Sequence, residues 1–310
     1  MNEYVKIRNQ FIEAVEKHDY SLVPITKKYR ATENNIPAAL CMMTTFRTID
    51  KIKVIPYYLE DPVRKNLFFA SVAAEGGHDV MFLCRLKVDE EQISEVEILI
   101  TRSRADSGFW WVPEDMYKNQ IAFTFPLDEE KKADYDELEM IGRAVFDPEV
   151  NPDIASNPNC VLMESGGIVF ESPAYIRVMN PMFVTDAPSR MIREPIPFGI
   201  HPGKPGDPDG RVLAVDVERG LAVVAIDVQG YVSPYVVPDE TSTVFAPKTL
   251  IETHRSAMTE ELLDSDNTFI EMPASSVTYT IVRYQKGELL GLHQFSLVEG
   301  PGARSPWEVI

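Results

Sequence analysis

The sequence predicts an α+β protein built from two related halves in tandem, each a helix packed on a curved antiparallel sheet. The chain has 310 residues, which is enough for two domains of about 150 residues. A helix pattern followed by strand patterns begins at the N-terminus, and this order restarts near residue 130. We therefore expect one domain over 1–125 and a second, more divergent domain over 126–310. A single large sheet crossing 100–160 is the alternative.

The first half opens with an amphipathic helix. Apolar residues recur at helical spacing over 2–18, and Pro24 stops a short helical turn that follows. Residues 27–35 then form a strand into a turn, and 49–66 form a strand, a proline-containing loop and a turn. Residues 67–102 read as three strands joined by the turns "EGGHD" and "DEEQ".

The second half restarts with a helix at about 131–146, preceded by acidic residues that favour a helix N-terminus. Residues 194–211 are so rich in Pro and Gly that we expect a loop, one that moves when a ligand binds. Two hairpins follow, over 212–232 and 275–298. The repeat is weak in identity and stronger in the order of its elements.

Composition narrows the classes of partner. Hydrophobic residues make up 45% of the chain and charged residues 25%, as in ordinary folded proteins. The net charge of -18 argues against binding to nucleic acid or to anionic lipid. The three cysteines, Cys41, Cys84 and Cys160, form no CxxC pair, so we expect buried free thiols in a reducing compartment. Without a signal sequence or an apolar span, the expected location is the cytoplasm.

Motifs for metals and cofactors are missing from the sequence. The five histidines are isolated, and there is no HxH, HExxH or CxxC pattern. No GxGxxG dinucleotide motif, phosphate loop or GxSxG nucleophile motif occurs either. We expect acid–base chemistry without a metal, nicotinamide or flavin.

Glu97 is the main candidate for such chemistry. Strand alternation over 93–101 puts it on one face with Glu95, while Val96, Ile98 and Ile100 occupy the other. If Glu97 points into an apolar cavity, burial raises its pKa and makes it a usable base. If it points outward, it is an ordinary solvated strand residue, and alternation alone favours that simpler interpretation.

Other polar and aromatic side chains share this ambiguity. Arg85 lies on the neighbouring strand among apolar residues, so it is either solvent-facing or paired. Glu33 ends a strand, and His78 follows a glycine turn, where a loop histidine is the commoner role. Of the adjacent Tyr57 and Tyr58, one points inward. Trp110 and Trp111 line a pocket or cover a sheet end, and His293 takes the place of Glu97 in the C-terminal hairpin.

The order of these motifs resembles a known superfamily. The segments are "FIEAVEKHDYSLVPITKKYRATENN", "FRTIDKIKVIPYYLEDPVRKN", "VMFLCRLKVDEEQISEVEILITR" and the closing "GPGARSPW". They are similar to mostly uncharacterised members of the nuclear transport factor 2-like group, also called SnoaL-like or ketosteroid-isomerase-like. The resemblance covers most of residues 10–102. Phe46 stands where this group has Trp, which puts a stacking role there in doubt.

The resemblance implies two cone-shaped halves whose bent sheets enclose an apolar cavity, packed sheet to sheet. It also implies a cofactor-independent lyase or isomerase that dehydrates or cleaves a hydrophobic aromatic or polyketide-like small molecule. A non-catalytic small-molecule-binding or scaffold protein of the same fold is the alternative. The sequence is compatible with a homodimer.

The residues are assigned as follows on this hypothesis. Glu97 is the general base, Arg85 with Tyr57 or Tyr58 stabilises an oxyanion, and Glu33 or His78 is the acid. The expected substrate-binding residues are Phe46, Arg47, Trp110, Trp111 and His293.

Overall fold

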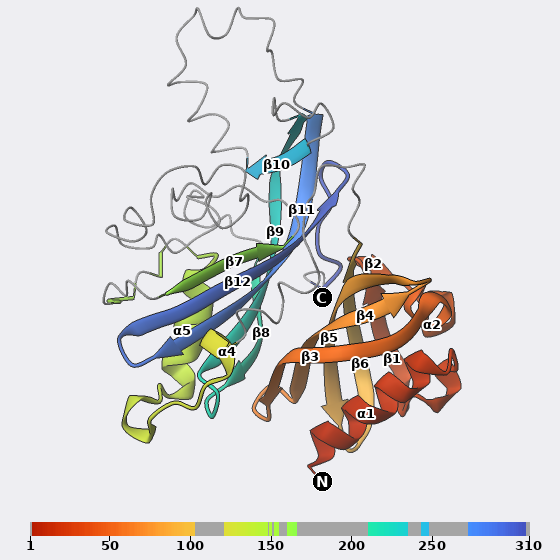
Figure 1. The fold of residues 1–310 in the computed structure, drawn as a ribbon, viewed down its shortest axis with the longest axis horizontal. Helices are drawn as coiled ribbons and strands as arrows, with labels where there is room; N and C mark the ends of the chain where they lie inside the picture. Colours follow the sequence, from red (N-terminus) through yellow and green to blue (C-terminus); the bar gives the residue numbers. More distant parts are fainter. Residues whose placement is uncertain are drawn as a thin grey trace, which may run out of the picture.

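The computed structural model describes residues 2–102, 121–147, 149–150, 152–154, 160–165, 210–234, 243–247 and 272–307. Its elements are mostly strands, with few helices, so the chain is α+β as predicted (Figure 1). None of the helices in this part of the chain is long and apolar enough to cross a bilayer.

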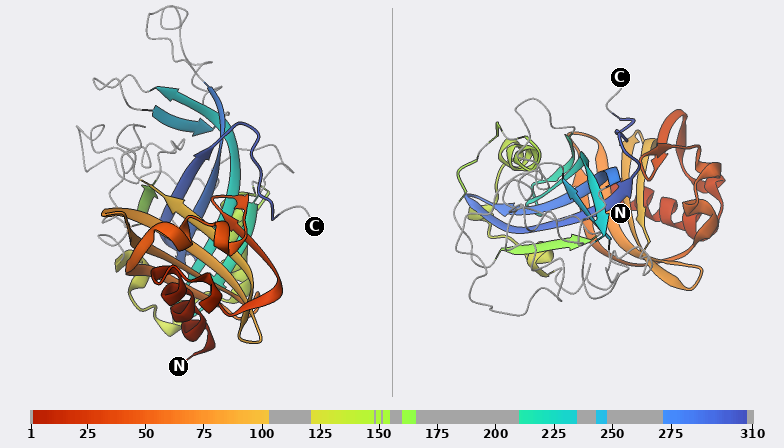
Figure 2. Two further views of the ribbon diagram at one scale, coloured as in Figure 1. Left: turned by 90° about the vertical axis from the view of Figure 1, so that its right-hand side faces the viewer. Right: turned by 90° about the horizontal axis from the view of Figure 1, so that it is seen from above.

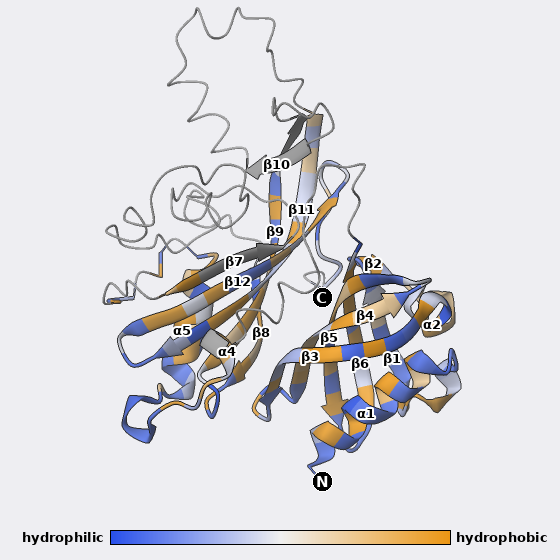
Figure 3. Cartoon of the chain, in the orientation of Figure 1, coloured by the Kyte–Doolittle hydropathy of each residue, from blue (hydrophilic) through white to orange (hydrophobic). Residues whose placement is uncertain are grey.

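The helix α1 (Glu3–Glu16) begins at Asn2, whose side chain accepts a hydrogen bond from the Tyr4 amide. Such a cap satisfies an amide that the first helical turn leaves free. The helix buries Ile7, Phe11, Ala14 and Val15 on one face. Hydrophilic and hydrophobic residues alternate along it in Figure 3, as the sequence pattern predicts.

The first sheet has six strands in the order β2-β1-β6-β5-β4-β3. Short helical turns lie beside β1 and β3: η1 (Tyr20–Leu22), η2 (Leu40–Met42) and α2 (Thr45–Thr48). The strands are β1 (Ile25–Glu33), β2 (Ile36–Pro37), β3 (Ile49–Asp61), β4 (Asn66–Glu75), β5 (His78–Asp89) and β6 (Gln92–Thr101). The three strands predicted over 67–102 are therefore confirmed.

Two sequence expectations about this sheet are wrong. The proline-containing loop is part of one long strand, β3, whose register shifts between Val54 and Tyr57. Pro56 is accepted there because β3 is an edge strand and a bulge needs no regular amide donor. The sheet is also not purely antiparallel, since β1 runs parallel to β6.

After residue 102 the described chain resumes with α4 (Ile121–Thr124), and the second half then opens with η4 (Glu129–Lys131) and α5 (Tyr135–Ala144). The Asp134 side chain caps α5 by accepting a hydrogen bond from the Glu137 amide. The strands are β7 (Val161–Ser165), β8 (Gly210–Asp216), β9 (Leu221–Pro234), β10 (Thr243–Pro247), β11 (Met272–Gln285) and β12 (Glu288–Glu299). Residues 210 and 211, expected in the loop, belong to β8, whereas 194–209 lie outside the described residues.

The two halves share one connectivity. In the first, β3, β4, β5 and β6 form an antiparallel run, and β1, which follows α1, joins β6 in parallel. In the second, β8, β9, β11 and β12 form the same run, and β7, which follows α5, joins β12 in parallel. In each half, the helix therefore directly precedes the strand that pairs in parallel with the last strand of the antiparallel run.

The two sheets pack face to face, and each helix covers the outer face of its own sheet (Figure 2). Alternation along the strands sends one set of side chains to the helix and the other to the opposing sheet. Phe69, Phe82, Val96 and Ile98 therefore pack with α1. The apolar layer between the sheets contains Tyr57, Leu59, Phe68, Leu83, Leu99, Phe123, Leu221, Val223, Tyr279, Ile281 and Phe295, among others.

Candidate functional site

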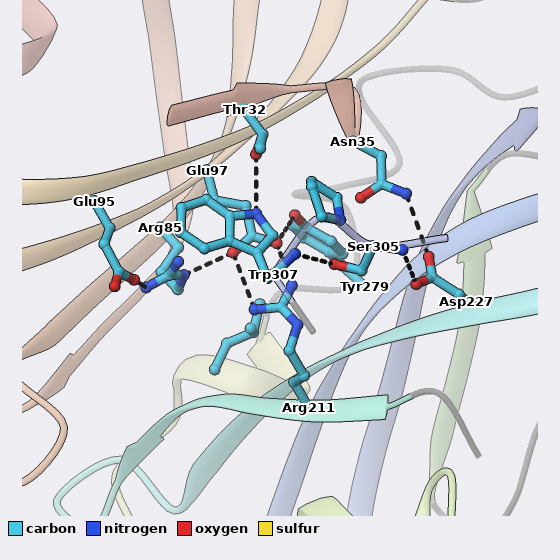
Figure 4. Close-up of polar contacts among 12 residues, drawn as sticks. Thr32, Asn35, Arg85, Glu95, Glu97, Arg211, Asp227, Tyr279, Ser305 and Trp307 are labelled. Carbon is cyan, nitrogen blue, oxygen red and sulfur yellow. Dashed lines mark hydrogen bonds and ion pairs between the residues drawn. The ribbon is translucent and has the colours of Figure 1, made fainter. Parts of the chain in front are cut away.

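Glu97 and Arg85, two of the residues predicted to be functional, do not lie under α1 but between the two halves (Figure 4). Glu97 on β6 is 2% exposed and faces the second half. Its carboxylate accepts from Arg85 Nε at 2.7 Å, from Arg211 Nη2 at 2.6 Å and from the Tyr279 hydroxyl at 2.6 Å. Glu97 is therefore not a solvated strand residue, and neither does it point into a cavity enclosed by the first sheet and its helix.

The register of the strands explains this cluster. Arg85 on β5 is the direct cross-strand partner of Glu97, so the two side chains share a face. Arg85 also donates from Nη1 to Glu95 at 2.8 Å, and it is only 3% exposed. Arg211 is the second residue of β8 and Tyr279 lies in the middle of β11, so the second half supplies two of the three partners of Glu97.

Charge neutralisation sets the protonation state of this cluster. Burial alone would raise the pKa of Glu97, but the charges of Arg85 and Arg211 and the hydrogen bonds from Arg211 and Tyr279 lower it to about 2. Burial and the charge of Glu97 hold the pKa of Tyr279 well above its usual value. At neutral pH Glu97 is thus a firmly ionised carboxylate, which is a poor general base.

A groove of about 560 Å³ opens beside this cluster, between the two halves. Six of its twelve lining residues are Lys or Arg and only Glu95 is acidic, although the whole chain carries a net charge of -18. The walls are Arg30, Val63, Arg64, Lys65, Asn66, Arg85, Lys87, Glu95, Arg211, Val212, Leu213 and Trp307. Five of these six cations pair with carboxylates: Arg64 with Asp61 and Glu139, Lys65 with Asp89, Arg85 with Glu95 and Glu97, Lys87 with Glu95, and Arg211 with Glu97. The groove therefore combines cations, most of them already paired, with one large aromatic side chain.

Trp307 lies at the edge of this groove, surrounded by guanidinium groups. The guanidinium carbons of Arg30, Arg85 and Arg211 lie 4.5, 4.7 and 5.9 Å from its ring centroids, within the range of cation–π interaction. The indole Nε1 donates to Thr32 Oγ1 at 3.1 Å. A second hollow of about 490 Å³ lies on the β1–β2 side and is also lined by Trp307 and Arg30.

His293 forms a second polar contact between the sheets. Its Nδ1 lies 2.7 Å from the Tyr57 hydroxyl, and the residues are 0% and 1% exposed. Phe123 and Phe295 pack around the pair. Burial lowers the pKa of His293 to about 3 and raises that of Tyr57, so both groups are neutral at physiological pH.

Glu33 and His78, the two expected acids, lie apart from Glu97. Glu33 accepts from the amides of Thr44 and Thr45, at 2.6 and 3.0 Å, and from both of their hydroxyls, and so holds the start of α2. His78 is exposed at the beginning of β5, beside the turn that contains Gly77.

Tyr58 and the expected substrate-binding residues are also dispersed. Tyr58 donates to Glu60 at 2.7 Å and stacks under Arg8 on the outer side of β3. Phe46 packs edge-on against Phe11 in the core under α1, with their ring centroids 5.7 Å apart. Arg47 is exposed. Trp110 and Trp111 lie outside the described residues.

The space under α1 is filled by side chains. Ile7, Phe11, Phe46, Phe69 and Phe82 are all at most 2% exposed in one continuous apolar cluster. Cys84 lies in the same cluster, where burial raises the pKa of its thiol. Cys160 is buried as expected, but Cys41 is exposed in η2, so the expectation of three buried thiols is wrong. Over the described residues no three His, Cys, Asp or Glu side chains gather as a metal site would require.

Four residues of the site were not predicted. Arg211 stands at the end of the Pro- and Gly-rich segment, and Tyr279 lies in an ordinary strand pattern, so nothing local indicates that they meet Glu97. Arg30 was part of a predicted strand without a role. Trp307 belongs to "GPGARSPW", and an aromatic residue directly after Pro306 was the one available signal.

Comparisons with known proteins give limited further information. No family model and no curated protein matches the chain. Among solved structures, a third of this chain is similar to a de novo designed protein with a curved β-sheet, at 11% identity over 88% of that chain, TM-score 0.28. A proposed ketosteroid isomerase from Kribbella flavida matches at 9% identity over 33% of this chain and 80% of its own, TM-score 0.28. A nuclear transport factor 2-like protein of unknown function from Cytophaga hutchinsonii matches at 8% identity over 33% and 91%, TM-score 0.27.

Proposed function

We propose that this protein binds a small anionic molecule in the groove between its two halves. The observation that carries the proposal is a groove lined by six Lys and Arg side chains, five of them paired with carboxylates and one, Arg30, without an ion pair among the described residues. Fixed positive charge in a recess attracts and orients anions. The two halves that form the recess are, on this proposal, tandem copies of one cone-like helix-and-sheet unit, with domains of 1–125 and 126–310.

Pairing within the groove distinguishes the cations that hold the fold from those that meet a ligand. Arg85 is buried and committed to Glu95 and Glu97. Arg30 is half-buried and forms no ion pair within the described part of the chain; its Nη2 donates to the Pro306 carbonyl at 3.0 Å. Arg30 is therefore the cation best placed to gain a carboxylate or phosphate partner.

The buried network gives the groove a rigid floor. Arg85, Glu97, Arg211 and Tyr279 hold one another in fixed positions, so the floor needs no rearrangement before a ligand binds. Pre-organisation of this kind lowers the entropy that binding removes. It also explains why a buried carboxylate with a pKa of about 2 is useful here without acting as a base.

A cofactor-free lyase or isomerase acting on a hydrophobic aromatic or polyketide-like molecule is the second candidate. Its support is the convergence of Arg85, Glu97 and Tyr279 in one buried cluster, since acid–base sites gather titratable groups in this way. It ranks second because that cluster neutralises its own carboxylate. Turnover that vanishes in Glu97→Gln while the fold persists would reverse the ranking.

Binding of matched acids and amides tests the proposal. We expect small carboxylates to bind at one per chain in titration calorimetry at low salt, and their primary amides to bind at least about tenfold more weakly. Arg30→Gln should weaken carboxylate binding by about tenfold, the usual value of one charge-assisted hydrogen bond. In the unaltered protein, carboxylate binding should weaken as the salt concentration rises.

Arg143→Gln is the matched control, because Arg143 is an exposed arginine on α5 that pairs with Asp147, away from the groove. It should leave carboxylate affinity unchanged. Amides that bind as tightly as acids, or equal affinities for Arg30→Gln and the unaltered chain, would contradict an anion-binding groove.

A further inference from the structure

The last described residues, 300–307, cross from the second half to the first and end on the groove. Residues 300–305 are fixed to the second half. Ser275 Oγ donates to the Gly300 carbonyl at 2.6 Å, Gln229 Nε2 donates to the Ala303 carbonyl at 3.0 Å, and the Ser305 amide donates to Asp227 at 2.5 Å. The base of this segment is thus bound through the side chains of β9 and β11.

The tip of the segment is attached differently. Pro306 and Trp307 contact the first half through two hydrogen bonds, from Arg30 to the Pro306 carbonyl and from the Trp307 indole to Thr32. The remaining described contacts of the indole are cation–π contacts with arginines. The tip can therefore leave the first half by bending after Ser305, while the anchors of the base stay intact.

The indole occupies the boundary between two spaces. The groove of about 560 Å³ and the hollow of about 490 Å³ both have Trp307 and Arg30 in their walls. Both spaces therefore border the indole and Arg30. The place that the indole now fills is suited to a flat aromatic ring, because guanidinium faces of Arg30 and Arg85 already lie against it.

We propose that Pro306 and Trp307, carried by the anchored segment 300–305, form a displaceable cover of the groove, and that the ligand of the groove is a planar aromatic acid whose ring replaces the Trp307 indole. This inference rests on the proposed anion-binding function. The ring of such a ligand would keep the stacking on Arg30 and Arg85, and its carboxylate would give Arg30 the ion pair that it does not make within the described residues. A neutral ring or an aliphatic acid can supply only one of the two interactions.

The probes are 2-naphthoate, its neutral counterpart 2-naphthalenemethanol and the non-aromatic cyclohexanecarboxylate. The protein is labelled with 5-fluorotryptophan, and the fluorine resonance of Trp307 is assigned by its loss in Trp307→Phe. We expect 2-naphthoate to move this resonance toward its position in the unfolded chain, with the same dissociation constant as calorimetry gives. The two other probes should bind more weakly and leave the resonance in place.

Trp307→Ala provides the second readout. A ligand that must first displace a cover binds with its affinity reduced by the open fraction, so with about one molecule in ten open, removal of the indole raises affinity about tenfold. If Trp307 instead stacked on the ligand, the same change would weaken binding. Weaker binding of 2-naphthoate to Trp307→Ala, or an unmoved Trp307 resonance at saturation, overturns the proposal.

The failures of the two proposals are distinguishable. If cyclohexanecarboxylate binds in an Arg30-dependent manner while 2-naphthoate leaves Trp307 in place, the anion groove stands and the displaceable cover is rejected. If neither carboxylate binds, both are rejected. Thr32→Val, which removes the acceptor of the indole hydrogen bond, should weaken the closed state and tighten 2-naphthoate binding in the same direction as Trp307→Ala.

Discussion

The Glu97 cluster and the His293–Tyr57 pair both place an ionisable side chain away from water, but they leave it in different charge states. In each, a buried titratable group of one half meets a tyrosine hydroxyl of the other. Glu97 keeps its charge because two arginines compensate it, whereas His293 gives up its proton and stays neutral among phenylalanines. The difference teaches that what surrounds a buried group, rather than burial alone, decides whether it is charged.

The largest expected effect comes from Glu97→Gln. The amide keeps the shape but leaves Arg85 and Arg211 buried or half-buried without their shared counter-charge. Breaking a buried ion pair from one side costs about 3–5 kcal/mol, so the free energy of unfolding in urea should fall by that amount.

Glu95→Gln is the control for that measurement. Glu95 is partly exposed to solvent and pairs with Arg85 and Lys87. Because solvent weakens such ion pairs, we expect the free energy of unfolding to fall by about 1 kcal/mol or less. Equal losses for the two variants would mean that the Glu97 network does not hold the halves together.

Tyrosine-to-phenylalanine changes compare the two contacts directly. Tyr279→Phe removes a donor to a charged carboxylate, and we expect a loss of about 1.5–3 kcal/mol in the free energy of unfolding. Tyr57→Phe removes a hydrogen bond between neutral groups, with an expected loss of about 1 kcal/mol. Urea unfolding at neutral pH measures both. If Tyr57→Phe lowered the free energy of unfolding more than Tyr279→Phe, the assignment of a charged Glu97 and a neutral His293 would be wrong.

The same pair should also make the stability of the protein depend on pH, through His293. The folded pKa of about 3 lies below the ordinary 6.5, so the unfolded chain binds a proton that the folded chain does not as the pH falls below 6.5. Stability should therefore drop by about 1.4 kcal/mol between about pH 7.5 and pH 5.5, where Glu97 stays ionised. His293→Gln should remove this drop, and unfolding at the two pH values measures it.

His78→Gln is the matched histidine control, since His78 is exposed at the start of β5. It should retain the full drop. If His293→Gln retains it as well, a proton on His293 is tolerated in the folded state, and the neutral pair with Tyr57 is wrong.

The sequence predicted the elements of the fold better than the site. Periodicity placed the helix now seen at Glu3–Glu16, the three strands over 66–101 and the restart at Tyr135–Ala144, because each depends on neighbours a few residues away. Alternation also put Glu95 and Glu97 on one face correctly. It could not show which face meets the second half, because that depends on Arg211 and Tyr279, more than 100 residues further along the chain.

The contacts between the halves also constrain the order in which the chain acquires its structure. During synthesis residues 1–102 emerge well before β8 to β12, and Tyr57, Phe68 and Leu83 then have no opposing sheet to cover them. Glu97 and Arg85 are hydrated in that nascent chain and lose water only when Tyr279 and Arg211 arrive. The newly made first half thus exposes a wide apolar sheet face to solvent, and chaperones bind surfaces of this kind.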